Sequence, residues 1–160
     1  MKSEQKLIKK IKLKKKNSRV YYMTSSNTEI SNRNILLLTK LLTKKKQNIL
    51  RICFHRKDNE QINEMMIITK GKFSNNPHKQ KKSSVSYKIL KGKMSVNIFS
   101  KKKRLFKKFS LGNGKNDLKF LRLNANIFRS ISCSGKFTIF IETSCGPFSD
   151  NQTQWMKLNN

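Results

Sequence analysis

The chain has 160 residues, and its 37 lysines and arginines against 8 aspartates and glutamates give a formal net charge of +29. This length suits one domain with a buried core and short tails, and no apolar run approaches the roughly 20 residues of a membrane-spanning helix. The positive charge either favours contact with nucleic acid, anionic lipid or acidic saccharide, or reflects lysines that fill generic surface positions.

Residues 1–19 form a lysine-rich segment with four interspersed aliphatic residues, Leu7, Ile8, Ile11 and Leu13. One interpretation is a short amphipathic helix on an acidic surface. The composition favours instead a basic, solvated and disordered arm. Because no apolar core is followed by small cleavage-site residues, we expect no signal peptide and a cytoplasmic protein.

Residues 20–48 are expected to form a strand and a helix ahead of the main body. The strand is the β-prone VYYM at residues 20–23, and Ser31 is placed to cap the helix that follows. The helical pattern runs through NRNILLLTKLLTKKK, where Leu38 and Leu42 share an apolar face and lysines occupy the last turn.

Beyond this helix, residues 49–149 read as short strands separated by turn residues, which predicts an antiparallel sandwich or small barrel. We expect Gly92 to close a hairpin between SVSYKIL and KMSVNIFS. The turn residues CSG (133–135) are expected to separate the last two strands. The polar C-terminal tail, residues 150–160, is expected to fold back onto the barrel through Trp155.

Three cysteines, Cys53, Cys133 and Cys145, lack a C-x-x-C spacing, which argues against a zinc ribbon or a thioredoxin-type site. Cys53 and Cys133 lie in apolar runs and are expected to be buried, reduced thiols. No glycine-rich phosphate loop, nucleophile elbow or paired-carboxylate motif is present.

Three segments resemble the WbuC family of small cupin-fold metalloproteins: RICFHRKDNEQINEMMII (51–68), PHKQKKSSVSYKILKGKMSVNIF (77–99) and IFIETSCGPF (139–148). The resemblance covers about residues 20–148 and implies a mainly β fold, a small antiparallel, jelly-roll-like cupin barrel with one N-terminal helix. Proteins of this family are associated with gene clusters for O-antigen and other surface polysaccharides. The resemblance therefore implies a role in lipopolysaccharide biosynthesis, and by analogy a homodimer.

The resemblance also identifies the positions where a cupin barrel holds its metal. The first cupin motif places two histidines, a glutamate and a glycine at a spacing that this chain keeps with His78, Gln80, Val85 and Gly92. The second motif normally ends in a histidine, where this chain has Arg129. A zinc, iron, nickel or manganese ion, expected from the family alone, would keep only His78, and Arg129 adds a permanent positive charge. These replacements predict a degenerate metal site.

The predicted ligand pocket comprises His55, Glu64, His78, Gln80, Tyr87, Arg129 and Glu142. Arg129 either contacts the carboxylate or phosphate of an anionic sugar derivative, or turns to solvent or pairs with Glu142 or Glu64. His55 is expected at the pocket rim rather than as a catalytic base. Each glutamate is either an ion-pair partner or an acid–base group.

Three functions stay open from the sequence. The first is a WbuC-like protein that has lost its metal and binds a saccharide-related ligand or none. The second is a metal-dependent sugar isomerase or epimerase, in which His55, Glu64 or Glu142 joins His78 as a ligand.

The third is a nucleic-acid-binding module, suggested by basic and aromatic residues in KKKRLFKKF (101–109). The strand period of that run places Leu105 inward and its lysines in solvent, and no nucleic-acid motif accompanies it. The sequence leaves open whether the chain is an enzyme.

Overall fold

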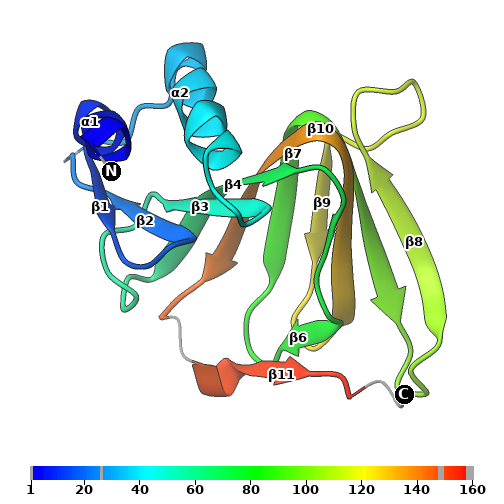
Figure 1. Cartoon of the computed structure of the whole chain (residues 1–160). Helices are drawn as coiled ribbons and strands as arrows, with labels where there is room; N and C mark the ends of the chain where they lie inside the picture. The colour runs from blue at the N-terminus through cyan, green and yellow to red at the C-terminus, as the bar shows by residue number, and fades with distance from the viewer. Residues whose placement is uncertain (1, 26, 148–149, 158–160) are drawn as a thin grey trace.

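The computed structural model describes residues 2–25, 27–147 and 150–157. It is mainly β, with two helices near the N-terminus rather than the one expected (Figure 1). The elements in chain order are α1 (Lys2–Lys10), β1 (Leu13–Lys15), β2 (Val20–Met23), α2 (Asn32–Thr43), β3 (Ile49–Cys53), β4 (Ile62–Lys70), β5 (Phe73–Ser74), β6 (His78–Gln80), β7 (Val85–Phe99), β8 (Leu105–Leu111), β9 (Phe120–Leu123), β10 (Phe128–Cys145), a 3-10 turn (Asp150–Gln152) and β11 (Thr153–Trp155).

The strands form one curled sheet in the order β1-β2-β3-β4-β10-β6-β11, while β7 pairs with β10, β8 and β9, and β5 pairs with β10. The pairing is antiparallel throughout these strands, except that β2 runs parallel to β3. In Figure 1 the two helices lie on the side of β1–β4, and β6 and β11 cross the lower end of the barrel. No described helix is long and apolar enough to cross a membrane.

Two long strands, β7 and β10, run through both halves of the barrel. They pair over residues 85–91 with 139–144 and again over 93–99 with 128–134, with irregular register between. At this bend Gly92 has φ +83, and a Cβ there would meet the Phe137 carbonyl oxygen at 2.6 Å, so only glycine fits. The predicted hairpin at Gly92 and the predicted break at CSG are therefore wrong. The glycines bend continuous strands instead of ending them.

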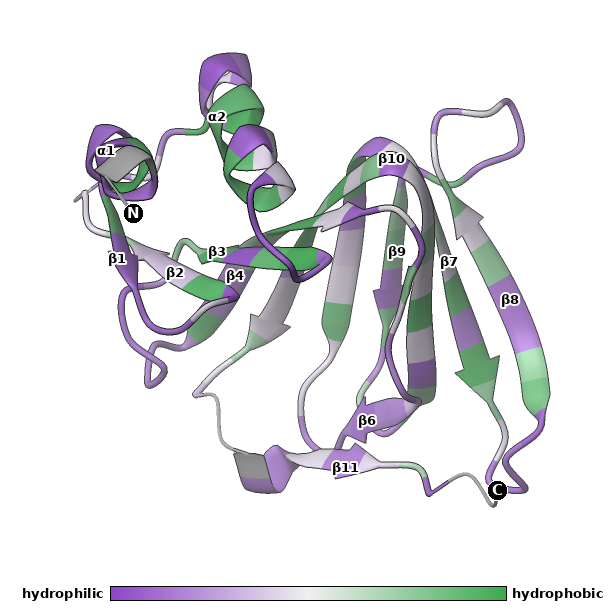
Figure 2. Cartoon of the chain, viewed as in Figure 1, coloured by the Kyte–Doolittle hydropathy of each residue, from purple (hydrophilic) through white to green (hydrophobic). Residues whose placement is uncertain are grey.

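The sheet separates two apolar cores, because successive side chains of a strand point to opposite faces. Figure 2 shows hydrophobic and hydrophilic residues alternating along parts of β7. The core inside the barrel includes Val85, Tyr87, Val96, Ile131 and Phe140. The core between the sheet and the helices includes Tyr21, Leu38, Leu41, Ile52, Met66 and Ile68.

The N-terminal segment is folded, so the prediction of a disordered arm over residues 1–19 is wrong for the part that the structure describes. Ile11 and Leu13 are only 3% and 7% exposed and join the core beneath the helices. The Lys45 Nζ lies 2.7 Å from Glu4 Oε1 and ties α1 to the end of α2. The few aliphatic residues of this segment are enough to fold it, because they pack together into the core that α2 and the sheet form.

Other expectations are confirmed in detail. The Ser31 hydroxyl accepts a hydrogen bond from the backbone N–H of Asn34 and caps α2. The C-terminal tail does fold back, because β11 pairs with β6 and places Trp155 opposite His78. Cys53 and Cys133 are buried free thiols.

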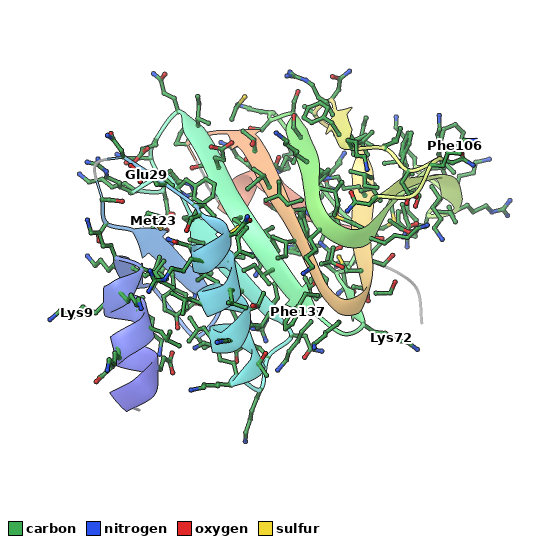
Figure 3. The ribbon with its side chains drawn as sticks, turned by 90° about the horizontal axis from the view of Figure 1, so that it is seen from above. Lys9, Met23, Glu29, Lys72, Phe106 and Phe137 are labelled. Carbon is green, nitrogen blue, oxygen red and sulfur yellow. The ribbon has the colours of Figure 1, made fainter. Side chains whose placement is uncertain are left out.

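One predicted inward residue is exposed. Leu105, at the start of the edge strand β8, is 59% exposed, and its neighbour Phe106 is 76% exposed. A register shift between Ile98 and Phe99 disturbs the pairing with β8 at this point. Figure 3 places Phe106 at the opposite end of the molecule from the helices.

Candidate functional site

A cavity of about 330 Å³ opens at the mouth of the barrel. Its walls come from β2, β3, β4, β6, β10 and β11, together with the turn before β2 and the loop after β3. The lining residues are Lys16, Asn17, Val20, Tyr22, Arg51, Cys53, His55, Asp58, Asn63, Met65, His78, Gln80, Arg129, Glu142, Ser144, Thr153 and Trp155.

Cross-strand pairing explains how residues far apart in sequence reach this cavity. Directly opposed residues of neighbouring strands share one face of a sheet. One such row crosses five strands through Tyr22, Cys53, Met65, Glu142 and Tyr87. These residues therefore point into the barrel together, where the first four line the cavity and Tyr87 belongs to the apolar core.

At the far side of the cavity, His78 on β6 is opposed both to Arg129 on β10 and to Trp155 on β11. The rings of His78 and Trp155 lie 4.8 Å apart between centroids. This pairing brings an imidazole, a guanidinium group and an indole to one wall of the cavity.

Arg129 points into the barrel, so the expectation that it turns to solvent or pairs with Glu142 or Glu64 is wrong. The side chain is 3% exposed, and its Nε donates a hydrogen bond of 2.7 Å to Tyr87 Oη. Burial raises the pKa of Tyr87 far above its ordinary value, which keeps the phenol protonated. Among the described residues the other guanidinium nitrogens of Arg129 form no hydrogen bond or ion pair, and so remain available to a ligand.

A second guanidinium group and a carboxylate face the same cavity. Arg51, on β3, is half-buried, and burial lowers its pKa despite the nearby Glu142 carboxylate. Burial raises the pKa of Glu142, while the positive charges of Arg129 and Arg51 act in the opposite direction. Neither arginine approaches Glu142 within 4 Å in the described part of the chain. The three charges thus share the cavity without pairing with one another.

Three amide atoms beside these charges are buried without a hydrogen-bond partner. They are Nδ2 and Oδ1 of Asn63, a residue only 2% exposed, and Oε1 of Gln80. An unsatisfied buried polar group costs about 1–3 kcal/mol. Because such groups are rare in folded proteins, each of them needs a physical explanation.

One ring nitrogen of His78 is hydrogen-bonded to the backbone. Its Nδ1 lies 3.1 Å from the Asn76 carbonyl oxygen, which can only accept, so Nδ1 carries the hydrogen. Burial lowers the pKa of His78, and the positive charges of Arg129 and Arg51 lower it further. The imidazole is therefore held in its neutral form.

This donor set does not fit the divalent metal that the cupin resemblance implies. Gln80 offers only a neutral amide oxygen, Val85 is 1% exposed within the apolar core, and Arg129 stands directly opposite His78 as a cation. Over the described ranges no three His, Cys, Asp or Glu side chains are grouped to hold a metal ion. The replacement ligands considered from the sequence, His55, Glu64 and Glu142, do not gather around His78.

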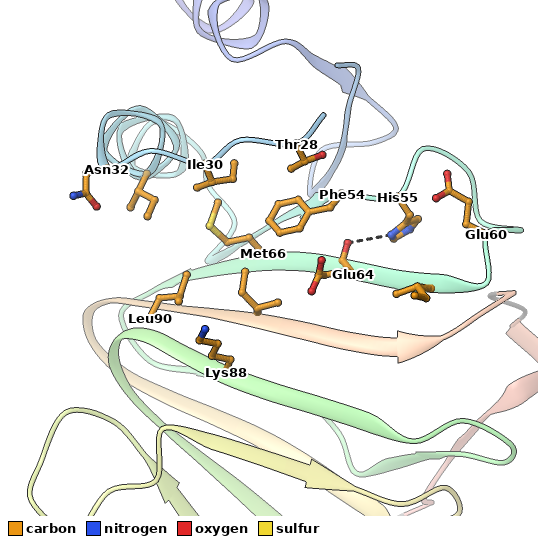
Figure 4. Close-up of a pocket in the computed structure, with 13 residues that line it drawn as sticks. Thr28, Ile30, Asn32, Phe54, His55, Glu60, Glu64, Met66, Lys88 and Leu90 are labelled. Carbon is orange, nitrogen blue, oxygen red and sulfur yellow. Dashed lines mark hydrogen bonds between the residues drawn. The ribbon is translucent and has the colours of Figure 1, made fainter. Parts of the chain in front are cut away.

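Glu64 lies outside the barrel in a larger groove of about 770 Å³ between α2 and the outer face of the sheet (Figure 4). It faces away from the cavity because its neighbours Asn63 and Met65 face inward. The Thr143 hydroxyl donates to Glu64 Oε1 at 3.1 Å. His55 borders both hollows, and its Nδ1 lies 3.1 Å from the Glu64 carbonyl oxygen.

The rim of the cavity is closed by a hydrogen-bonded group that sequence reasoning missed. Lys16 Nζ lies 2.6 Å from Asp58 Oδ2, and the Tyr22 hydroxyl donates to Asp58 Oδ1 at 2.5 Å. Arg51 and Asn63 were missed as well. The alternation of side chains in a strand could have identified Arg51 and Asn63. It places Arg51 on the same face as Cys53 in RICFH, and Asn63 on the same face as Met65 in QINEM.

The thiol at the cavity does not provide a nucleophile. Burial raises the pKa of Cys53 to about 11, so the group stays a protonated thiol near neutral pH. The chemistry available at the site is therefore that of guanidinium, carboxylate, imidazole and amide groups.

Comparison with known proteins shows the fold and no more. No protein-family model and no curated protein matches the chain. Among solved structures, KdgF from Halomonas sp. is 11% identical with a TM-score of 0.51, covering 68% of this chain and 87% of its own. CapF in complex with the inhibitor 3-isopropenyl-tropolone is 11% identical with a TM-score of 0.54, covering 71% of this chain and 33% of its own.

A third structure, oxalate decarboxylase from Bacillus subtilis, is 20% identical with a TM-score of 0.49, covering 61% of this chain. This chain spans 24% of the decarboxylase chain and 33% of the CapF chain. The similarity to KdgF and CapF, both cupin-fold proteins, confirms the prediction of a mainly β chain folded as a small cupin barrel.

Proposed function

We propose that this cupin-fold chain binds an anionic sugar derivative directly in its barrel, without a metal ion, as part of surface polysaccharide biosynthesis. One observation carries the proposal. Arg129, buried and anchored by Tyr87, stands where the cupin pattern has a metal-ligating histidine. This replacement supports a degenerate metal site, in which a cation of the protein itself takes the place of the ion. The polysaccharide context and a cytoplasmic location come from the WbuC resemblance.

Two arginines at one cavity favour a carboxylate or phosphate group. A guanidinium group presents paired N–H donors that match such an anion, and its charge is not lost near neutral pH. Arg129 and Arg51 have no acidic partner within 4 Å in the part of the chain described. An anionic ligand would supply the missing counter-charge.

The neutral groups favour a ligand with hydroxyl groups in addition to its charge. The amide of Asn63 and the Oε1 atom of Gln80 need donors and acceptors, and a polyol offers both. Trp155, 57% exposed beside His78, offers an aromatic surface at the mouth. The cavity of about 330 Å³ is at the lower end of ligand pockets, which suits one sugar ring with its acidic group.

Calorimetric titration at 150 mM NaCl, where surface charges are screened, tests this function. We expect glucuronate, galacturonate or glucose 6-phosphate to bind, and neutral glucose to bind far more weakly. The variant Arg129→Met should bind the anionic sugars about 100-fold less tightly. Arg122→Met, on the exposed part of β9, is the matched control and should change nothing.

Two results would contradict the proposal. One is equal binding of anionic sugars by wild type and Arg129→Met, with both variants folded by circular dichroism. The other is stoichiometric zinc, iron, nickel or manganese that survives dialysis against a chelator, measured by elemental analysis.

A second candidate, binding of single-stranded nucleic acid, is favoured by one exposed edge. Phe106 is 76% exposed on β8 among lysines, and Lys107 Nζ lies 4.8 Å from the ring centroid of Phe109. If this edge binds specifically, Phe106→Ser should weaken binding of a labelled oligonucleotide at 200 mM salt. Binding that vanishes at that salt concentration would reflect only the net charge.

A further inference from the structure

We propose that the cavity also catalyses a proton transfer on the bound sugar, with the carboxylate of Glu142 as the group that removes the proton. This inference rests on the proposed function, because the arginines must first hold an anionic sugar. It adds a reaction class and a catalytic residue to that function.

The geometry brings Glu142 beside the anion site. Glu142 on β10 and Tyr87 on β7 are direct cross-strand partners. The Oη atom of the same tyrosine accepts the Nε hydrogen bond of Arg129 at 2.7 Å. The carboxylate and the guanidinium group thus both neighbour one fully buried tyrosine, and both line the cavity.

Glu142 differs from the other acid of the cavity in having no partner. Asp58 is held by Lys16 and Tyr22 at the rim and cannot turn inward without breaking both contacts. Glu142 forms no hydrogen bond and no ion pair with any described residue. A carboxylate that faces a ligand cavity in this state is free to accept a proton from the ligand.

The electrostatic surroundings suit this role. Burial raises the pKa of Glu142, and the charges of Arg129 and Arg51 oppose this rise without cancelling it. The net effect is a raised pKa, so the Glu142 carboxylate is a stronger base than that of an ordinary glutamate. The structure therefore provides the base independently of any metal.

The step balances without an oxidant, reductant or second substrate. Glu142 takes a proton from a carbon next to the carbonyl group of the sugar. The electrons of the broken C–H bond form the enolate, whose negative charge the guanidinium groups of Arg129 and Arg51 stabilise. The proton then returns from Glu142 to carbon, and exchange of the carboxylic acid with solvent allows solvent hydrogen to enter the product.

Solvent exchange measured by proton NMR in D₂O tests the inference. We expect wild-type protein to replace the hydrogen next to the carbonyl group in glucuronate, galacturonate or fructose 6-phosphate faster than the protein-free blank, with glucose unaffected. Glu142→Gln should lower this rate at least about 100-fold, while calorimetry shows the same sugar still bound within about tenfold. Glu29→Gln, an exposed acid outside the cavity, is the matched control and should exchange at the wild-type rate.

The outcomes separate the two proposals. Binding of the anionic sugars without exchange above the blank would overturn the proton transfer and leave the binding function intact. Exchange by Glu142→Gln at the wild-type rate, or loss of binding in this variant, would overturn the role of Glu142. Absence of binding of every anionic sugar by wild-type protein would overturn both.

Discussion

The two faces of the same curled sheet differ in how their polar groups are paired. Under the helices, the hydroxyl of Tyr21 bonds to both Glu4 and Lys45, and these two form an ion pair. Inside the barrel mouth, Arg51 and Glu142 face one cavity without pairing. Both faces are made from the same strands. The difference indicates that the helix side stabilises the fold, whereas the barrel side keeps its polar groups available.

Strand β4 shows the contrast within four consecutive residues. Asn63 and Met65 point into the cavity, and the amide of Asn63 lacks any partner. Glu64 and Met66 point to the helix side, where Met66 is fully buried and Glu64 is bonded to a hydroxyl group. One strand therefore carries a functional surface and a structural surface in alternation.

The largest expected effect comes from the helix side alone. Leu41→Ala removes a fully buried side chain from α2 and should lower the free energy of unfolding by about 3 kcal/mol. Urea denaturation checks this value. The control is Leu36→Ala, at a leucine of the same helix that is 55% exposed. Sugar affinity of the folded Leu41→Ala variant should stay unchanged. A changed affinity would show that the two faces are coupled.

The next prediction compares two fully buried tyrosines on opposite faces. Tyr87→Phe leaves the Nε of Arg129 without its acceptor and should cost about 2 kcal/mol of stability, together with a loss of anionic sugar affinity. Tyr21→Phe removes bonds to Glu4 and Lys45 and should cost about 1 kcal/mol with no effect on binding. Thermal unfolding measures the stability of both variants, and calorimetry measures their affinity for the anionic sugars. Equal effects on binding would remove the distinction between the faces.

The third prediction has the opposite sign for stability. Asn63→Leu replaces a buried amide that has no partner with an apolar side chain of similar size, so the free protein should gain about 1 kcal/mol. The same variant should bind the sugar less tightly, because it loses a donor and an acceptor. Asn97→Leu, which breaks a bond to Ser130, is the control and should not be stabilised. A destabilised Asn63→Leu variant would mean that the amide is satisfied in the free protein.

The sequence predicted the structure correctly where neighbouring residues alone determine it. The predictions failed where contacts between distant residues decide the outcome. Ser31 and the apolar period that follows it were enough to place α2. Gly92 was interpreted as a turn, yet the strand continues because the bend of β7 needs a residue without Cβ close to Phe137. The cupin spacing located His78 and Arg129. It could not show that Arg129 turns inward, because the acceptor Tyr87 is 42 residues away in the chain.

The smallest predicted effect lies at the rim of the cavity. The bonds from Lys16 and Tyr22 lower the pKa of Asp58, although burial acts against them. A carboxyl group whose folded pKa lies below its unfolded value adds stability above the unfolded pKa, and loses it as the pH falls through the folded pKa. Both side chains of the Lys16–Asp58 pair are 45% exposed, so this pair should contribute less than about 1 kcal/mol to the free energy of unfolding.

Thermal unfolding of wild type and Asp58→Asn between pH 7 and pH 2 measures this contribution. We expect wild type to be slightly more stable above about pH 4, near the ordinary pKa of an aspartate, and the two curves to converge below it as Asp58 is protonated. Glu29→Gln, at an exposed acid away from the rim, should follow wild type throughout. A difference that persists at pH 2 would assign the rim bond to the Tyr22 hydroxyl rather than to the charge of Lys16. The rim would then resemble the paired polar groups of the helix side more than the open charges of the cavity.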